Sequence, residues 1–210
     1  MQPNNGYIIG LTGTIGSGKS TVSAYLREQG VRIADADAIS RTTLQKGEEG
    51  YSRCVDLFGP SILLPDGEIN RKKLAAIVFS DEEARGKLNG IVHPLVLAEM
   101  QRQTQSAFLE GEPLVIWDVP LLFESGMHIL CTETWLVYCT EETSIRRLLL
   151  RDGMTREEAI RRIRSQMDTE TKMKLADRLL PNDGTLCQLY SRCRFLWQEA
   201  LLRIKSGIGQ

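Results

Sequence analysis

Eight residues near the N-terminus have the side chains and the spacing needed to hold a nucleoside triphosphate. The pattern G-x-x-x-x-G-K-[ST] is matched at every fixed position by Gly13-Thr14-Ile15-Gly16-Ser17-Gly18-Lys19-Ser20, called the phosphate loop below. Glycines let the backbone turn tightly and bring N–H groups onto phosphate oxygens, and a following helix adds partial positive charge. Lys19 is expected to reach the β- and γ-phosphates, and the Ser20 hydroxyl to ligate magnesium. We therefore expect a nucleoside triphosphate with magnesium to dock along Gly16 to Thr21.

The phosphate loop has the flanking sequence that this motif requires. Tyr7–Leu11 is short, apolar and β-prone, and Ser20–Gln29 has helical spacing and ends at Gly30, a good C-cap residue. Val31–Ile33 is a second expected strand, which completes a strand-helix-strand unit of the parallel α/β kind. A strand before the loop and a helix after it argue against a chance glycine-rich turn.

Three aspartates follow expected strands, where ligands of open parallel sheets bind. Asp35 and Asp37 come after the second strand, and in an extended chain their side chains would point the same way. Asp118 follows the expected strand Leu114–Trp117. One carboxylate near the γ-phosphate can orient an attacking hydroxyl and accept its proton, and another can hold magnesium directly or through water. The alternative is that these aspartates cap helices or stabilise turns. Arg41, one helical turn after Asp37, could touch a substrate phosphate or pair with an acidic neighbour.

Two arginines and one histidine are further candidates. Arg147 and Arg151 are four residues apart on one face of an expected helix. Such a pair can clamp a transferring phosphoryl group when a lid closes, and the alternative is a solvated helix face with ion pairs. His93 precedes Pro94 at an expected loop-to-helix corner, where the sequence fits a structural role as well as a functional one.

Further expected strands and helices give the fold class. The strands are Leu114–Trp117, Thr134–Cys139 and Arg178–Leu180. The helices are two short pieces within Ile69–Asn89, Val92–Leu109 with Pro94 in its first turn, Thr155 to about Met167 with a capping box, and about Leu186–Ile204, whose Leu189, Phe195, Leu196, Trp197, Leu201 and Leu202 are expected to pack. Apolar strands separated by helices predict an α/β fold with a parallel sheet covered on both faces. The stretch of about 41–111 has no clear sheet strand and is interpreted as a helical insertion.

Composition favours an ordinary globular protein. The 210 residues are 42% hydrophobic and 25% charged, which fits one domain with a substantial core. A net charge of -1 gives no electrostatic signature of nucleic-acid binding. No apolar stretch approaches the ~18 residues that span a bilayer. The five cysteines include no CxxC pair and indicate reduced thiols. We expect a cytoplasmic protein with no nucleic-acid and no membrane partner.

Several segments, in their order along the chain, resemble those of dephospho-CoA kinases. The most specific are Asp35-Ala36-Asp37, His93-Pro94 and Pro120-Leu121-Leu122-Phe123-Glu124. Further matches occur in the order found in that family: Arg41, Ile69-Asn70-Arg71, Arg147-Leu148, Arg151-Asp152, Gln166 and Asn182-Asp183-Gly184. The phosphate loop alone is shared by many NTPases, whereas these segments together are far more specific. The resemblance covers nearly the whole chain.

The resemblance implies a fold and a reaction. The fold is a P-loop NTPase fold similar to nucleoside monophosphate kinases, with a parallel five-stranded sheet flanked by helices. The core would comprise about 1–40, 112–140 and 168–210, with a CoA-binding helical insertion at about 41–111 and a lid at about 141–167. The reaction is transfer of the γ-phosphate of ATP to the 3′-hydroxyl of dephospho-CoA with magnesium, the last step of coenzyme A synthesis.

The resemblance also assigns roles to individual residues. Asp37 matches the family's proposed catalytic base, and Lys19 and Arg147 are the other catalytic candidates. The nucleotide-binding candidates are residues 13–21, Arg151 in the lid, and Asn182 and Gly184 in a loop near the adenine. The acceptor-binding candidates are Asp35, Arg41, His93, Asp118 and Leu121, and the magnesium candidates are Ser20 and Asp118.

Three positions depart from the family pattern without removing a group that the chemistry needs. Thr14 stands where a second glycine is usual, Ser144 where glutamine is common, and Leu179-Leu180-Pro181 in place of Val-Ile-x. The rival interpretations are another small-molecule kinase, a P-loop switch protein and a catalytically silent nucleotide-binding module. Turnover that depends on the acceptor would separate them. The sequence leaves open whether the protein is a monomer or a small homo-oligomer.

Overall fold

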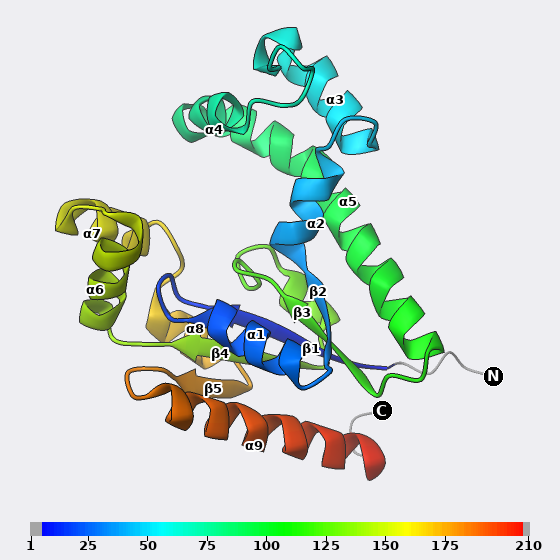
Figure 1. Ribbon diagram of the computed structural model, residues 1–210, viewed down its shortest axis with the longest axis vertical. Coiled ribbons are helices and arrows are strands. Elements are labelled where there is room, and N and C mark those ends of the chain that lie inside the picture. Colours follow the sequence, from blue (N-terminus) through cyan, green and yellow to red (C-terminus); the bar gives the residue numbers. More distant parts are fainter. Residues whose placement is uncertain (1–5, 208–210) are drawn as a thin grey trace. The chain divides into compact units, whose positions relative to one another are not determined.

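A computed structural model describes residues 6–207, which include a five-stranded sheet (Figure 1). The strand order is β2-β3-β1-β4-β5. β1 (Tyr7–Gly13) is parallel to both of its neighbours, β3 (Leu114–Asp118) and β4 (Glu133–Tyr138), and β4 is parallel to β5 (Arg178–Pro181). β2 (Arg32–Asp35) is the other edge strand. The predicted α/β fold with a parallel five-stranded sheet is confirmed.

Helices connect these strands along the chain. They are α1 (Lys19–Glu28), α2 (Ala36–Thr43), α3 (Glu49–Phe58), η1 (Pro60–Ile62), α4 (Arg71–Ser80), α5 (Glu82–Leu109), η2 (Met127–Leu130), α6 (Glu141–Asp152), α7 (Arg156–Arg164), α8 (Thr169–Leu175) and α9 (Leu186–Lys205). The capping box predicted at Thr155 is present and opens α7. Within the described chain, no helix combines the length and the apolar character needed to cross a membrane.

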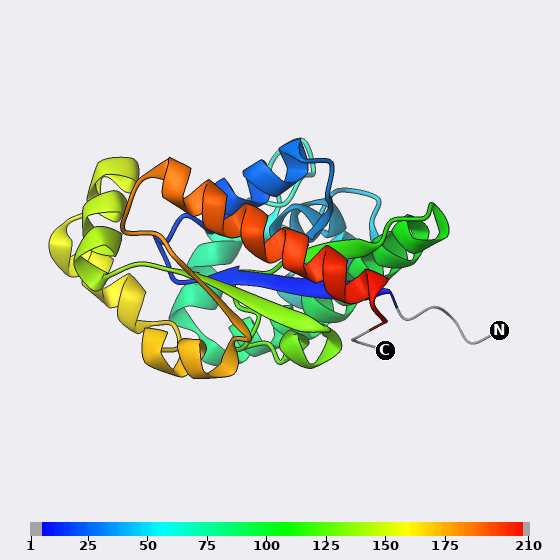
Figure 2. The ribbon, with the colours of Figure 1, turned by 90° about the horizontal axis from the view of Figure 1, so that it is seen from below.

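One face of the sheet packs against α1 and α9 (Figure 2). Side chains alternate along a strand, so Ile9 and Leu11 of β1 share this face with Ile116 of β3, and all three are fully buried. Tyr25 of α1 stacks on Tyr190 of α9, with ring centroids 4.6 Å apart and planes 13° from parallel. This apolar layer fixes both β1 and α1, and therefore both ends of the phosphate loop.

The carboxyl ends of four strands meet at one edge of the sheet. The register pairs Leu11 of β1 with Asp118 of β3, and Tyr138 of β4 with Pro181 of β5. The phosphate loop, which follows β1, therefore shares this edge with Asp118 and with Asn182, which follows β5. The topology gathers segments that are far apart in the sequence.

Contacts divide the chain into two compact units, one ending at Ala34 and resuming at Ser106, and the other spanning Asp35–Gln105. The second unit is helical, and its β structure among the described residues is Asp35, which ends β2, and an isolated bridge between Leu63 and Ile69. This agrees with the absence of a strand signal in that stretch.

The sequence predicted a helix that begins at Val92, with Pro94 in its first turn. α5 instead begins at Glu82, so Pro94 lies in its interior. The helix begins at Glu82 because the carboxylate of Asp81 accepts the N–H groups of Glu83 and Ala84, at 2.8 and 3.1 Å. Pro94 lacks an N–H and so removes one backbone hydrogen bond, which a long helix with a capped start can lose without ending.

α9 corrects a second expectation. Leu189 is buried, and Leu196, Trp197 and Leu201 pack against the core, as expected. Phe195 and Leu202 are instead 60% and 65% exposed. They are seven residues apart and so share one helix face, which points away from the sheet.

Candidate active site

The phosphate loop makes a tight turn between β1 and α1. Gly16 and Gly18 have φ angles of 72° and 90°, in the left-handed region that favours glycine. Among the residues that the structure describes, the backbone N–H groups of Gly16, Gly18, Lys19 and Ser20 have no acceptor. Unpaired N–H groups at a helix N-terminus are donors for an anion such as a phosphate.

Two side chains from other segments hold the carbonyl groups of the loop. Arg147 of α6 donates from one guanidinium nitrogen to the carbonyls of Gly16 and Ser17, at 3.1 and 3.2 Å. Asn182 donates from Nδ2 to the carbonyl of Ser17 at 2.6 Å. The C=O of Ser17 and the N–H of Gly18 belong to one peptide group and point in opposite directions, so holding this carbonyl keeps the Gly18 N–H directed into the turn. The N–H of Ser17 donates to the carbonyl of Thr14 at 3.0 Å.

Asn182 also explains why residue 18 is glycine. Its side chain is buried, and a Cβ at Gly18 would lie 2.4 Å from its Nδ2. The carbonyl of Asn182 accepts a hydrogen bond from Arg147 at 2.8 Å. Arg147 therefore joins the phosphate loop to the segment after β5.

Lys19 forms an ion pair with Asp118. Its Nζ contacts one carboxylate oxygen of Asp118, and the hydroxyl of Ser23 donates to the other. Asp118 is only 3% exposed, and a buried carboxylate needs such partners. The pair keeps the Lys19 ammonium at the carboxyl edge of the sheet, where a bound phosphate would compete with Asp118 for it.

Arg151 lies in a different environment from Arg147, although both belong to α6. Its guanidinium donates to both carboxylate oxygens of Asp152, at 2.7 and 2.9 Å, and its side chain is 64% exposed. The hydrogen bond to Asp152 raises the pKa of Arg151. One arginine of the predicted pair therefore holds the loop, and the other is paired at the surface.

Asp183 fastens the segment that leads into α6. Its carboxylate accepts the N–H of Thr140 at 3.0 Å and the Thr140 hydroxyl at 2.8 Å. Burial acts to raise the pKa of Asp183, but the hydrogen bonds from Thr140 and the charge of Arg147 lower it overall. The ionised carboxylate is thus the stable form in this site. The next residue, Gly184, is exposed.

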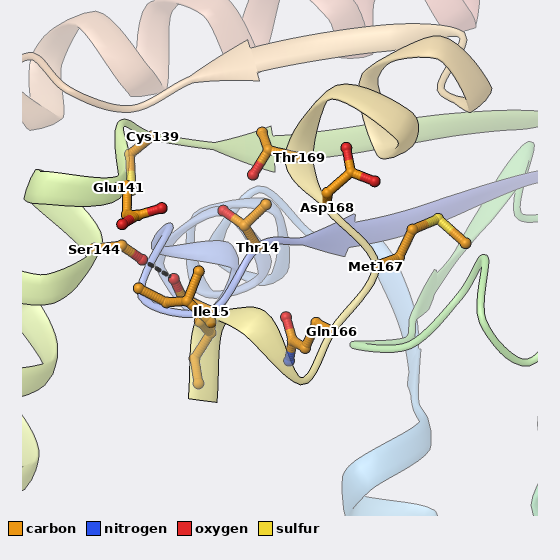
Figure 3. Close-up of a pocket in the computed structure, with 10 residues that line it drawn as sticks. Thr14, Ile15, Cys139, Glu141, Ser144, Gln166, Met167, Asp168 and Thr169 are labelled. Atoms are coloured by element: carbon orange, nitrogen blue, oxygen red, sulfur yellow. Dashed lines mark hydrogen bonds between the residues drawn. The ribbon is translucent and has the colours of Figure 1, made fainter. Parts of the chain in front are cut away.

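A cavity of about 50 Å³ lies beside the phosphate loop (Figure 3). Its walls come from Thr14 and Ile15, from the first turn of α6, and from Gln166–Thr169. The hydroxyl of Ser144 donates to the carbonyl of Ile15, as the dashed line in Figure 3 marks. The hydroxyl of Thr14 is buried and has no hydrogen-bond partner in the described chain.

Asp35, Asp37 and Arg41 lie at the start of the second unit, where Asp35 is the last residue of β2 and the other two belong to α2. The side chain of Asp35 caps α2 by accepting the N–H of Ala38 at 3.0 Å. Asp37 is exposed in the first turn, and Arg41 is in the last turn. This corrects the expectation that Asp35 and Asp37 point the same way, because that argument required an extended chain. Asp37 and Arg41 are four residues apart and share a helix face.

The two remaining acceptor candidates are exposed. His93 lies inside α5 and not at the start of a helix, since α5 begins well before it. Leu121 follows β3 and is 46% exposed. Among the residues that the structure describes, no three His, Cys, Asp or Glu side chains cluster as a metal site would require.

The family model for dephospho-CoA kinase matches residues 7–188. The chain belongs to this family. A dephospho-CoA kinase of Carboxydothermus hydrogenoformans is 47% identical over 179 residues, which are 85% of this chain and 87% of that protein. The crystal structure of TT1252 from Thermus thermophilus is 37% identical, covers 93% of this chain and 98% of its own, and gives a TM-score of 0.80. The structure of dephospho-CoA kinase from Campylobacter jejuni is 28% identical, with coverages of 92% and 96% and a TM-score of 0.64.

Membership in the dephospho-CoA kinase family confirms the resemblance that the sequence motifs indicated. One departure from the family pattern now has a physical explanation. Pro181 ends β5, an edge strand, where a missing N–H is tolerated. Its carbonyl accepts a hydrogen bond from Arg192 at 3.0 Å.

Sequence reasoning missed three residues that organise this site. Ser23 lies four residues after Lys19 on α1, so helical periodicity could have placed both beside Asp118. Ser144 and Asp183 appeared in the sequence only as parts of the family pattern, with no role assigned, and nothing in their local sequence indicated that they bind Ile15 and Thr140.

Proposed function

We propose that this chain transfers the γ-phosphate of ATP to the 3′-hydroxyl of dephospho-CoA and releases coenzyme A and ADP. The observation that carries this proposal is the match of the dephospho-CoA kinase family over residues 7–188, with the fixed positions of the phosphate loop intact. A kinase of this family takes its phosphate from ATP, and the unpaired N–H groups of the loop suit a triphosphate.

The phosphate loop, Lys19 and Arg147 form the proposed donor site. Residues 13–21 would hold the phosphates, with Lys19 exchanging its contact with Asp118 for one with the β- and γ-phosphates. Arg147 would keep the loop in shape, and Arg151 would contact the nucleotide once it left Asp152. Asn182 and Gly184 would border the adenine.

Ser20 and Asp118 are the proposed magnesium ligands. The residues fit this role in part: Ser20 is exposed in the first turn of α1, while both oxygens of Asp118 have protein partners. We therefore propose that the Ser20 hydroxyl binds directly and Asp118 through water. The ion would supply positive charge to the phosphates.

Asp37 is the proposed base. Its carboxylate would orient the 3′-hydroxyl and accept its proton as the phosphoryl group transfers. Asp35, Arg41, His93 and Leu121 would contact dephospho-CoA, with the helical insertion at about 41–111 as its binding region. The segment at about 141–167 would act as a lid that excludes water.

The test is release of ADP from ATP and magnesium, with and without dephospho-CoA, and with AMP, CMP, gluconate and shikimate as alternative acceptors. We expect strong turnover with dephospho-CoA alone and phosphate at the ribose 3′ position of the product. Turnover with another acceptor alone would rule out dephospho-CoA as the substrate but would leave the proposed phosphoryl-transfer mechanism unchanged. Slow hydrolysis that no acceptor accelerates would favour a nucleotide switch.

We also propose that the protein acts in the cytoplasm as a monomer or small homo-oligomer, without nucleic-acid or membrane partners. Five free thiols and a net charge of -1 support this assignment. Light scattering during gel filtration would measure the oligomeric state.

A further inference from the structure

Lys172 of α8 is a fully buried lysine with no role in the site described above. Its exposed fraction is 0%, and its Nζ lies 2.8 Å from Oε1 of Glu124, as an ion pair and not as a directed hydrogen bond. The same oxygen accepts the backbone N–H of Met167 at 3.2 Å. Glu124 follows β3, whereas Met167 precedes α8, so one carboxylate joins segments 43 residues apart.

Stability alone does not account for this pair. Burying an ammonium ion costs free energy, and only a well-placed partner offsets that cost. Buried ion pairs can often be replaced by apolar side chains of similar volume with no loss of stability, whereas removing one partner is strongly destabilising. The ion pair does hold the segment of Glu124 and the segment before α8 in one relative position. Apolar contacts would fix that position less strictly.

The segment that ends at Glu124 is fixed to the phosphate site at its other end. It begins at Asp118, the partner of Lys19. The N–H of Val119 donates to the carbonyl of Leu11 at 3.0 Å, and the carbonyl of Pro120 accepts the hydroxyl of Thr12 at 2.9 Å. Both acceptor and donor belong to β1, so the start of this segment is anchored to the sheet.

The segment held by Glu124 forms a wall of the cavity beside the phosphate loop. Gln166, Met167 and the two residues after them line this cavity opposite Thr14 and Ile15 (Figure 3). Lys19 thus contacts Asp118 at one end of the segment 118–124, and Glu124 at its other end contacts Met167.

We propose that Glu124 and Lys172 form a positioning pair, which sets the segment Gln166–Thr169 against the phosphate loop and so fixes the geometry for phosphoryl transfer. The proposal rests on the proposed kinase function. Phosphoryl transfer depends on placement and electrostatics more than on covalent chemistry, so a small displacement of this wall lowers the rate. Neither side chain belongs to the proposed donor or acceptor site, so the pair acts by positioning.

The test compares Lys172→Met, Glu124→Met and the double variant with the wild type. The control is Lys174→Met, an exposed lysine on the same short helix. Each single variant should lose thermal stability, because it leaves a charge without its partner. The double variant should regain stability but keep a kcat that is roughly ten- to a hundredfold below that of the wild type. Its affinity for ADP should stay within about threefold, because Arg147 and Asn182 still hold the phosphate loop.

A second readout does not depend on turnover. Hydrogen exchange of the Met167 amide should be faster in all three variants and unchanged in Lys174→Met. A double variant with wild-type kcat and unchanged exchange would overturn the proposal, because the pair would then be structural only. A wild type without dephospho-CoA turnover would refute the proposed function, and the exchange data would still decide whether the pair places this segment.

Discussion

Arg147 donates a hydrogen bond to the carbonyl of Asn182 at 2.8 Å and thereby joins α6 to the segment after β5. The other guanidinium nitrogen holds two carbonyls of the phosphate loop. An arginine expected to clamp the phosphoryl group directly is therefore placed to shape the site that receives it. The two roles predict different kinetic effects of the same substitution.

Arg147→Met should weaken nucleotide binding more than it slows catalysis. The substitution removes hydrogen bonds from a charged donor to three carbonyls, and each such bond contributes about 1.5–3 kcal/mol. We expect the Kd for ADP to rise about ten- to a hundredfold, since about 1.4 kcal/mol corresponds to tenfold. Titration calorimetry would measure it.

Arg146→Met is the matched control for that experiment, because Arg146 is the exposed neighbour on the same helix. It should bind ADP as the wild type does. If Arg147→Met bound ADP with the wild-type Kd and only its kcat were lower, the result would favour a direct contact of Arg147 with the transferring phosphoryl group.

Asp37→Asn should reduce kcat by ~10²–10⁴, the usual range for the loss of an acid-base group. Asparagine keeps the size and polarity of the side chain but cannot accept the proton. The Kd for ADP should not change, because Asp37 is not proposed to touch the donor. Single-turnover kinetics with dephospho-CoA would measure the effect.

The control for Asp37 is Asp56→Asn, an exposed aspartate on α3 of the same helical unit. It should retain wild-type turnover. Normal turnover by Asp37→Asn would remove the proposed base from the mechanism.

The parts of this molecule that local sequence determines were predictable. The phosphate loop and its flanking strand and helix follow from glycine conformations and periodicity, and the capping box at Thr155 follows from two side chains three residues apart. The prediction that Asp35 and Asp37 point the same way was wrong because the side chain of Asp35 caps α2. The local sequence leaves open whether the chain after Asp35 continues as a strand or begins a helix.

Partners distant in the sequence were not predictable. The bond from Asn182 to Ser17 spans 165 residues, and the bond from Ser144 to Ile15 spans 129. Both exist because parallel strands bring their carboxyl ends to one edge of the sheet. A single sequence gives the order of the strands along the chain. It does not show which side chains meet once these strands form the sheet.

Cys187 should be the one cysteine that reacts rapidly with Ellman's reagent in the folded protein at pH 8. It is exposed, whereas Cys54, Cys139 and Cys193 are buried. Burial, together with the nearby charge of Asp177, raises the pKa of Cys131 to about 12, so this thiol stays protonated. Cys187→Ser should abolish the fast phase. A fast phase that survived this substitution would contradict the burial of the other thiols.

The pair of Tyr7 and Glu133 predicts how stability depends on alkaline pH. The Tyr7 hydroxyl donates to Oε2 of Glu133 at 2.5 Å, in a site where Arg203 also pairs with that carboxylate at 3.0 Å. Burial, then the hydrogen bond and the charge of Glu133, raise the pKa of Tyr7 from 10.0 to about 12. The folded state therefore resists ionisation of a phenol that the unfolded chain ionises freely.

The sign of the effect follows from this difference. Below pH 10 the phenol is neutral in both states, and its contribution to stability is fully present. Between pH 10 and 12 only the unfolded state ionises, so the free energy of unfolding falls, by on the order of 2 kcal/mol at one pKa unit per 1.36 kcal/mol. Urea unfolding followed by tryptophan fluorescence would compare the wild type with Tyr7→Phe across this range. The wild type should lose its advantage over Tyr7→Phe as the pH rises, whereas Tyr190→Phe, which leaves the Tyr7 site intact, should keep the wild-type dependence. A constant difference between the wild type and Tyr7→Phe from pH 9 to 12 would show that the Tyr7 phenol ionises alike in both states.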